Sequence, residues 1–328
     1  MMFSKKRSIT IFWIILLMII LGLFGKKAFN YFKQEFLAKN DIAISYSTDN
    51  NYIYPLVVSM HSVMKNSKPS KLYNFTILVT NDVTDENKEK IYSLQKEYNN
   101  CKIQIINMGE KFANSQESVW SKAMYYRLNL PELLPNVDKC IYLDCDTLIR
   151  HDISEMTKIN MDDYYIAGVK DYNDRVLPDN NAHGERIGVP SLDSYICSGV
   201  LIMNLEKMRN DNMVAKLQDL VSENDRTSKF IFPDQDALNV ACYGHILILP
   251  LKYGAMTYLN FNETYEQSVY AKWVYNQKEW DEARTDPTIV HYTFGKPWVT
   301  VASPLHQEWW NLVDSLNIKD EIYAKYKQ

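Results

Sequence analysis

The sequence predicts an α/β domain with a largely parallel sheet. Two observations predict it: apolar stretches of strand length recur along the chain, and helical patterns separate them. A third is that the stretch KCIYLD is apolar enough for a strand that is covered on both faces, as strands of parallel sheets are. The expected strands are residues 42–47, 75–80, 102–108 and 139–144.

Two helical patterns lie between the first three strands. Pro55 stands in the first turn of one pattern, the position that proline favours in a helix. The other follows Thr84, a residue type that caps helices, and places Ile91, Leu94 and Tyr98 on one face. Since ligands of such sheets bind beyond the carboxyl ends of the strands, we expect the functional site there.

Composition limits the classes of function. The 328 residues are 46% hydrophobic and 23% charged, an ordinary globular composition. A net charge of −4 provides no electrostatic basis for binding nucleic acid, so no nucleic-acid partner is expected. No C-x-x-C pair occurs among the cysteines, so we expect reduced thiols rather than disulfides or a zinc site. The cysteines are Cys101, Cys140, Cys145, Cys197 and Cys242.

The N-terminal segment predicts a membrane anchor. ITIFWIILLMIILGLF lies between two groups of basic residues, and the uncharged stretch is near the lower limit for a membrane span. A cleaved signal peptide is the alternative, but no small-x-small cleavage site follows. We therefore expect a single-pass membrane protein. Its predicted divisions are a basic tail (1–8), a transmembrane anchor (9–25), a stem (26–40), a catalytic domain (41–302) and a C-terminal helical tail (303–328).

Two carboxylates stand one residue apart at the end of the fourth strand. Asp144 and Asp146 follow the apolar run of IYLDCD, and oxygen ligands at this spacing can turn toward one divalent cation. Such cations, Mg²⁺ or Mn²⁺, usually also hold substrate phosphates. A D-x-D pair alone is weak evidence, since the chain has a second one at Asp234 and Asp236. A solvated loop with two surface aspartates is the alternative.

A phosphatase of the haloacid dehalogenase type is another alternative. Such enzymes also place D-x-D after an apolar strand and use the first Asp as a nucleophile. There an intervening Gly normally precedes the Thr, near the start of the domain. Here Thr147 follows Asp146 directly, and the motif lies in the middle of the chain.

Several motifs recur in the order of a known family. From Asp41 to about residue 300 the chain resembles glycosyltransferase family 8, whose members are retaining nucleotide-sugar transferases with a GT-A fold. Any one of the motifs is weak, but the ordered set is specific. The resemblance implies a Rossmann-like mixed sheet flanked by helices. The motifs are STDNNY (47–52), YYRL (125–128), YLDCD (142–146), SGVLIMNL (198–205), DQD (234–236) and HYTFGKPW (291–298).

By resemblance, one group of residues binds the nucleotide. Asp49 would bond to the uracil edge, Tyr52 would stack on the ring, and Asn51 lies nearby. A strand followed by an Asn-rich turn is the alternative for this stretch. Arg127 would meet the diphosphate and the sugar, because its guanidinium is a fixed fork of hydrogen-bond donors that matches phosphate oxygens. Lys296, which follows Gly295, would also meet the diphosphate.

By the same resemblance, the remaining residues bind the metal ion and the donor sugar. His291 would join Asp144 and Asp146 around Mn²⁺ or Mg²⁺. Asp171 would bind hydroxyl groups of the donor sugar, with Asp174 as an open alternative. The residues nearest the anomeric carbon would be Asp234 and Gln235; Asp234 could equally cap a helix. His61 and His183 are interpreted as structural or surface residues.

The chain departs from the family pattern at two places. Cys197 stands where many members have an Asn that contacts the sugar, and a thiol is a poor hydrogen-bond donor. The loop between His291 and Lys296 is one residue shorter than in many members. An inactive protein that binds UDP or a glycan is therefore an alternative to an enzyme.

The resemblance implies a Mn²⁺-dependent hexosyltransferase. It would move galactose or glucose from a UDP-sugar to a glycan or glycolipid acceptor, with the membrane as a further partner through the N-terminal helix. Because UDP-sugars are made in the cytosol, a bacterial protein of this kind would carry its catalytic domain there. A eukaryotic one would act in the Golgi lumen.

Overall fold

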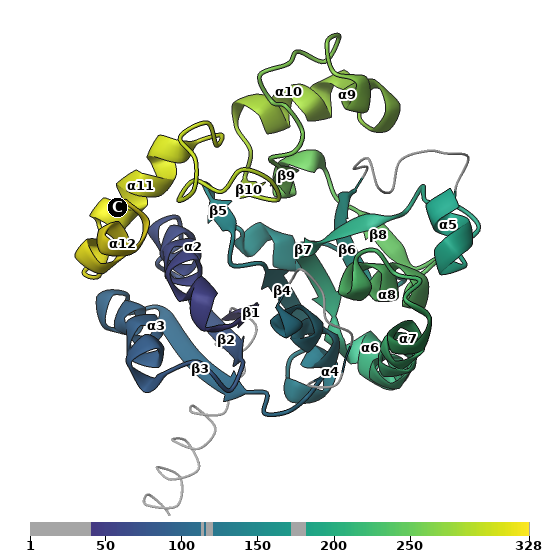
Figure 1. Ribbon diagram of the computed structural model, residues 1–328, viewed down its shortest axis with the longest axis horizontal. Helices are drawn as coiled ribbons and strands as arrows, with labels where there is room; N and C mark the ends of the chain where they lie inside the picture. The colour runs from purple at the N-terminus through teal and green to yellow at the C-terminus, as the bar shows by residue number, and fades with distance from the viewer. Residues whose placement is uncertain (1–40, 113–114, 116–120, 172–181, 328) are drawn as a thin grey trace, which may run out of the picture. The chain divides into compact units, whose positions relative to one another are not determined.

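A seven-stranded mixed sheet organises the fold in the computed structural model, which describes residues 41–112, 115, 121–171 and 182–327 (Figure 1). Its strand order is β3-β2-β1-β4-β7-β6-β8. The first four strands along the chain lie where the sequence predicts them. The strands are β1 (Asp41–Thr48), β2 (Leu72–Val79), β3 (Cys101–Asn107), β4 (Lys139–Leu143), β6 (Ile166–Lys170), β7 (Ile196–Asn204) and β8 (Ile246–Ile248).

Strand direction changes at one strand of this sheet. β2 and β3, β1 and β4, and β6 and β8 pair in parallel. β7 runs antiparallel to both of its neighbours, with Leu143 of β4 opposite Val200. The start of β7 therefore lies at the carboxyl end of β4, and the YLDCD and SGVLIMNL motifs meet at that edge.

A second, three-stranded sheet joins distant parts of the chain. It consists of β5 (Thr147–Ile149), β10 (Ile289–His291) and β9 (Ala255–Met256), with β10 in the middle. β10 is antiparallel to β5 and parallel to β9. Because β5 begins directly after the D-x-D pair, this sheet brings the C-terminal half of the chain to that pair.

The helices cover both faces of the larger sheet. Thr84 caps α3 through the backbone N–H of Asn87, as its residue type predicts. The α-helices are α2 (Ile53–Lys65), α3 (Asp85–Glu97), α4 (Leu130–Leu133), α5 (Ala182–Ile187), α6 (Leu205–Asn210), α7 (Met213–Thr227), α8 (Pro233–Ala241), α9 (Val269–Val274), α10 (Gln277–Thr285), α11 (His306–Asp314) and α12 (Lys319–Tyr326). Four 3₁₀ helices complete the described elements: η1 (Asn50–Tyr52), η2 (Lys122–Asn129), η3 (Ser154–Lys158) and η4 (Leu251–Tyr253).

The core divides into two apolar clusters on opposite faces of the larger sheet. Side chains alternate along β4, so Ile141 and Leu143 enter the cluster beneath α2, α3 and α11. Cys140 and Tyr142 enter the other, beneath α6, α7 and α8 (Figure 1). Both faces of β4 are buried, as the apolar sequence of this strand predicts.

The prediction of a single-pass membrane protein requires correction. No helix in the described part of the chain is long and apolar enough to cross a membrane. The longest described helix, α7, has 15 residues, and at about 1.5 Å of rise per residue it falls short of a hydrocarbon core about 30 Å thick. The predicted anchor at 9–25 lies outside the described residues, as do the tail at 1–8 and the stem at 26–40. The anchor, the membrane partner and the membrane localisation are therefore not retained.

Candidate active site

A cavity of 980 Å³ opens at the carboxyl ends of β1, β4 and β6. It lies where parallel strands of α/β sheets present their ligands. All of the predicted site residues except Gly295 line it. These are Asp49, Asn51, Tyr52, Arg127, Asp144, Asp146, Asp171, Asp234, Gln235, His291 and Lys296.

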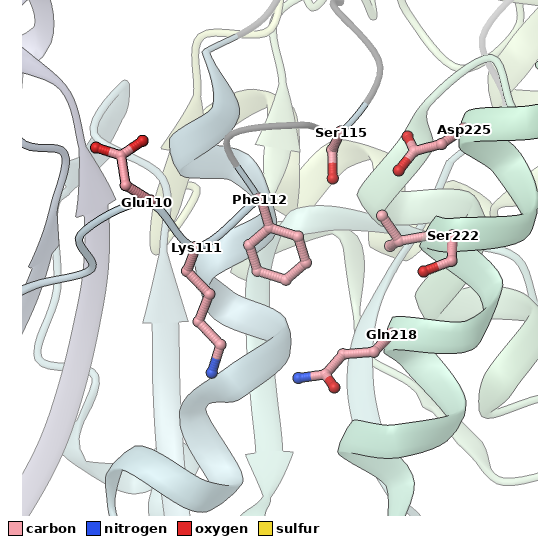
Figure 2. A pocket seen from close by; sticks show the side chains of 8 residues that line it. Glu110, Lys111, Phe112, Ser115, Gln218, Ser222 and Asp225 are labelled. Carbon is pink, nitrogen blue, oxygen red and sulfur yellow. The ribbon is translucent and has the colours of Figure 1, made fainter.

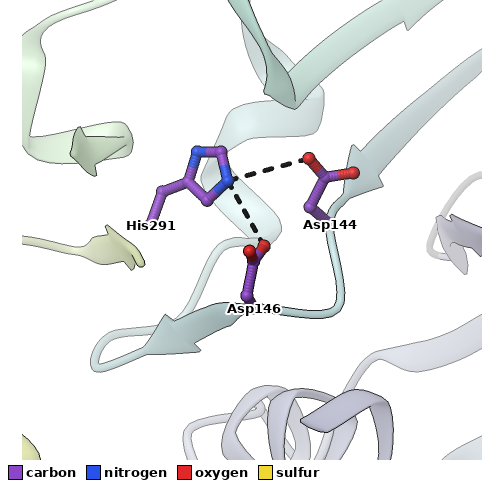
Figure 3. A group of neighbouring side chains, drawn as sticks. All are labelled: Asp144, Asp146 and His291. Carbon is purple, nitrogen blue, oxygen red and sulfur yellow. Dashed lines mark ion pairs between the residues drawn. The ribbon is translucent and has the colours of Figure 1, made fainter. Parts of the chain in front are cut away.

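Three of these side chains form a group that could hold a metal ion. One ligand atom from each of Asp144, Asp146 and His291 lies within 4.8 Å of the other two. His291 Nε2 is 3.3 Å from Asp146 Oδ1 and 3.7 Å from Asp144 Oδ2. Figure 3 shows the imidazole directed at both carboxylates. Among the described residues, this is the one group with such geometry.

Gly199 provides the room for this group. A Cβ atom built at Gly199 would lie 2.1 Å from His291 Cε1 and 2.7 Å from Asp144 Oδ2. Real Cβ atoms do not approach other atoms so closely, so a glycine is required at this position of β7. The two carboxylates and the imidazole are donors that suit Mn²⁺, and the residues present therefore fit a divalent cation.

Two cations balance the charge of the aspartates. Arg127 Nη2 is 2.8 Å from Asp144 Oδ1, and Lys296 Nζ pairs with Asp146 Oδ2. Burial raises the pKa of Asp146, but Lys296 and His291 outweigh burial and hold that pKa well below its usual range. Burial lowers the pKa of His291, yet its neighbours Cys197 and Asp146 raise it to about 10. The carboxylate beside Nε2 therefore favours the protonated form of the imidazole.

Arg127 is buried and ties together three parts of the site. Its Nη1 donates to the Ser198 carbonyl oxygen at 2.6 Å, and its Nε lies 3.2 Å from Asp234 Oδ2. The guanidinium also lies over the Tyr142 ring, 4.2 Å from its centre. Arg127 thus holds η2, β4, β7 and α8 in one arrangement, which the sequence of its own segment does not indicate.

The two residues predicted near the anomeric carbon lie in the first turn of α8. The alternative that Asp234 caps this helix is wrong, since the helix begins at Pro233 and Phe232 holds the cap position. Asp234 instead accepts from Ser198 Oγ at 3.1 Å. Burial raises the pKa of Asp234, and Arg127 partly offsets that rise.

Gln235 is fixed at both ends of its amide. Oε1 accepts from the Ser198 backbone N–H at 2.9 Å, and Nε2 donates to Asp171 Oδ2 at 2.7 Å. Nε2 also lies 3.1 Å from Tyr195 Oη. These partners assign the orientation of the amide. The alternative residue Asp174 lies outside the described residues, whereas Asp171 is buried at the cavity wall.

A buried polar network behind Gln235 is missed by sequence reasoning. Tyr258 Oη donates to Asp171 Oδ1 at 2.9 Å, and Tyr195 Oη donates to Asp236 Oδ1 at 2.5 Å. Asp236 also pairs with His183 Nε2 at 2.8 Å and accepts from the backbone N–H groups of residues 231 and 232. The DQD spacing places Asp236 beside the site, but its partners come from other segments.

The predicted base-binding residues lie at the end of β1. Asp49 Oδ1 accepts from the backbone N–H groups of Asn51 and Tyr52 and so caps η1. The Tyr52 ring is partly exposed and meets the Trp298 ring edge to face, with 6.1 Å between ring centres. The Asn-rich turn that was the alternative interpretation of this stretch is therefore present. Its side chains Asp49, Asn51 and Tyr52 also line the cavity.

Gly295 allows a turn of the loop backbone and does not line the cavity. Its φ of 65° lies in the left-handed region that favours glycine, and it is absent from the cavity lining. This turn places Lys296 against the Asp146 carboxylate and the Tyr292 carbonyl oxygen. Trp310 Nε1 then donates to the Pro297 carbonyl oxygen at 3.1 Å and attaches the loop to α11.

A smaller hollow of 370 Å³ lies beside α7. Gln218, Ser222 and Asp225 project into its wall from one face of that helix, opposite Phe112 (Figure 2). It holds no group of metal-ligating side chains among the described residues. The chemistry-bearing residues of the described chain thus gather in the larger cavity.

Comparison with known proteins gives consistent matches. The model of the family described as Glycosyl transferase family 8 matches residues 43–302. Lipopolysaccharide 1,2-glucosyltransferase of Escherichia coli is 28% identical over 260 residues, which are 78% of this chain and 72% of that protein. A Haemophilus influenzae protein that carries a glycosyltransferase name is 34% identical over 206 residues. The match spans 62% of this chain and 60% of that protein.

Solved structures share the fold. The crystal structure of the galactosyltransferase LgtC, in complex with donor and acceptor sugar analogs, matches with a TM-score of 0.69. The identity is 22%, and the match covers 84% of this chain and 96% of that one. This likeness supports the predicted mixed α/β, GT-A-like architecture.

Proposed function

Since the chain belongs to glycosyltransferase family 8, as its ordered motifs predict, we propose that it transfers a hexose from a UDP-sugar. The hexose is galactose or glucose, and the acceptor is a hydroxyl group of a glycan or glycolipid. The anomeric configuration is retained. The observation that carries this proposal is the convergence of Asp144, Asp146 and His291 on the cavity that Gln235 also lines.

The cavity has groups suited to each part of the donor. Asp49, Asn51 and Tyr52 would bind the uracil at the end of β1, where an aromatic face and hydrogen-bond acceptors are available. Lys296 would exchange its ion pair with Asp146 for one with the diphosphate, which carries more negative charge. Asp171 and Gln235 would bind the hydroxyl groups of the sugar.

Asp144, Asp146 and His291 would hold Mn²⁺ or Mg²⁺. When bound, such an ion supplies Lewis-acid stabilisation of the negative charge on the departing diphosphate. Lys296 adds a second positive charge near the same group, and a fixed charge in a water-poor site stabilises the transition state strongly. Arg127 keeps Asp144 oriented through its bond to Oδ1.

Transfer would proceed on one face of the sugar. The acceptor oxygen forms its bond to the anomeric carbon on the side from which the phosphate oxygen leaves, and the hydroxyl proton passes to that phosphate oxygen. The hydrogen bonds of Gln235 support this route. An amide is a weak nucleophile, and the Gln235 Oε1 atom already accepts a backbone N–H. Gln235 therefore positions the sugar rather than attacking it.

The test measures UDP release from a panel of UDP-sugars, with Mn²⁺ and with a chelator. We expect release from UDP-galactose or UDP-glucose that needs the metal. The variants Asp144→Ala and His291→Ala should lose it and keep their fold by circular dichroism. Asp163→Ala and His151→Ala remove an exposed carboxylate and an exposed imidazole outside the cavity and should keep activity.

Two further measurements, phosphate release and UDP binding, separate the alternatives. A phosphatase would release phosphate from p-nitrophenyl phosphate and lose that activity in Asp144→Asn. An inactive binding protein would bind UDP without turnover of any donor. Metal-dependent transfer that persists in both Asp144→Ala and His291→Ala would refute the proposed site.

A further inference from the structure

The edge of His291 that faces away from the carboxylates contacts a thiol. His291 Nδ1 lies 3.6 Å from Cys197 Sγ, within hydrogen-bonding distance for sulfur. Both side chains are buried, with 5% of His291 and 8% of Cys197 exposed. The imidazole is therefore held at two edges, by Asp144 and Asp146 at Nε2 and by Cys197 at Nδ1.

The thiol is placed to support the metal group and not to join it. The ligand atoms that lie within 4.8 Å of one another come from Asp144, Asp146 and His291, and Cys197 is not among them. Its sulfur contacts the nitrogen that a cation on Nε2 leaves free. In metal sites this second nitrogen usually donates its proton to an acceptor, which fixes the ring and its tautomer.

The backbone of β7 makes this contact specific. Gly199 lies so close to the ring that an added Cβ would be 2.7 Å from His291 Nδ1. The ring has no room to shift toward β7, and Cys197, two residues before Gly199 on this strand, contacts its Nδ1 edge. One strand thus provides both the wall against the ring and the sulfur at its edge.

We propose that Cys197 is a positioning residue for the metal ligand His291, with its sulfur as the acceptor for Nδ1–H. This inference rests on the proposed function. It assigns Cys197 to the metal half of the site, although the family resemblance places this position at the sugar. The sequence leaves Cys197 as a departure from the pattern, whereas the structure provides it with a partner.

The contact has a consequence for metal binding. An imidazole that loses its Nδ1 partner can rotate and change tautomer, so Nε2 spends less time directed at the carboxylates. Loss of such a partner typically weakens metal binding by about 10- to 100-fold. Since sulfur is a weak acceptor, we expect a loss near 10-fold for this site.

The experiment measures Mn²⁺ binding directly, by electron paramagnetic resonance of the free ion, with UDP present and no acceptor. Cys197→Ala should weaken Mn²⁺ binding by about 10-fold, whereas Cys197→Ser, which retains a polar acceptor, should lose less. Cys101→Ala is the matched control, because it removes a buried thiol outside the cavity and should bind Mn²⁺ as the wild type does. UDP binding without metal should be unchanged in all three.

The outcomes distinguish this inference from the proposed function. Wild-type Mn²⁺ affinity in Cys197→Ala, together with altered discrimination between UDP-sugars, would overturn the inference alone and assign the thiol to the sugar. If Cys197→Ala folds poorly by thermal melting, Cys197→Thr serves as a second variant. It adds a branched methyl group but keeps an acceptor, and a loss larger than that of Cys197→Ser is expected. A wild-type chain that binds no Mn²⁺ would overturn the proposed function and this inference with it.

Discussion

His291 is the cross-strand neighbour of Thr147 in the antiparallel pairing of β10 with β5. Thr147 follows Asp146 directly, and its Oγ1 donates to the Asp144 carbonyl oxygen at 2.8 Å. The Tyr292 backbone N–H in turn donates to the Asp146 carbonyl oxygen at 2.9 Å. The register of two short strands therefore places the imidazole against the two carboxylates.

Gly199→Ala tests the space that the imidazole requires. The added methyl group would meet His291 Cε1 at 2.1 Å, so the ring must move away from the carboxylates. We expect Mn²⁺ affinity and transfer to fall by about 100-fold, the cost of a displacement near 1 Å in a preorganised site. Isothermal titration with Mn²⁺ and UDP checks this. Gly254→Ala is the control, since its methyl meets the Val169 side chain at 3.1 Å and lies outside the cavity. Equal affinities in the two variants would contradict the prediction.

Lys296→Met tests the competition between an ammonium group and the metal. Lys296 pairs with Asp146 in the structure, so removal of its charge should strengthen Mn²⁺ binding without nucleotide by about 10-fold. Turnover of the UDP-sugar should fall by about 100-fold, because the diphosphate loses a fixed cation. Mn²⁺ titrations with and without UDP separate the two effects. Lys272→Met, on the exposed surface of α9, should change neither. Weaker Mn²⁺ binding without nucleotide would show that Lys296 does not compete with the ion.

Asp236→Ala tests the buried network behind Gln235. The change leaves Tyr195 Oη, His183 and two backbone N–H groups without their acceptor. The free energy of unfolding should fall by about 3–5 kcal/mol, the usual cost of removing a buried acceptor and leaving its charged or polar partners unpaired. Urea denaturation measures it. Asp219→Ala, at an exposed position of α7, should stay within about 0.5 kcal/mol of the wild type. A similar small change in both would mean that the network contributes little to stability.

His61 predicts a pH dependence of stability. Burial lowers the pKa of His61 from 6.5 to about 4, because the ring lies in α2 between Tyr98 and Ser315. The unfolded chain therefore binds the proton more readily, and the contribution of neutral His61 is complete above pH 6.5. It is lost as the pH falls toward 4.

The measurement compares the wild type with His61→Gln by urea denaturation at pH 7.5 and pH 5.0. Between these values the wild type should lose about 2 kcal/mol more than the variant. Gln is neutral at both values and keeps a polar side chain, so acid effects of other groups cancel in the difference. Equal losses would mean that His61 titrates alike in the folded and unfolded chain.

Local patterns predicted the parts of the site that lie within single segments. The apolar run before Asp144 predicted a strand buried on both faces, and the i, i+2 spacing predicted two carboxylates at its end. Thr84 predicted the start of α3 for a similar reason, since a cap depends on neighbours along the chain. The first turn of α8 was predicted less well, because residue type made Asp234 a plausible helix cap. The structure gives Asp236 the backbone bonds and Asp234 the bond to Ser198.

Such local patterns did not predict the contacts between distant segments. Tyr258 donates to Asp171 from the segment that follows β9. Arg127 reaches Asp144, Asp234 and the Ser198 carbonyl oxygen from η2, which packs against α7 and α8. Cys197 was readable as a departure from the family pattern, but its partner was not. Hydrogen bonds between distant segments depend on register and packing, which residue types along one stretch do not specify.

The amino-acid sequence by itself determined the alternation of strands and helices, the family and the residue types that carry the chemistry, because periodicity and motif order are properties of the chain. The tertiary structure decided which of those residues meet, and it joined His291 to Asp144, Asp146 and Cys197. The physical reason is that strand pairing and close packing against Gly199 act across distant parts of the chain, where one residue of register moves a side chain to the opposite face.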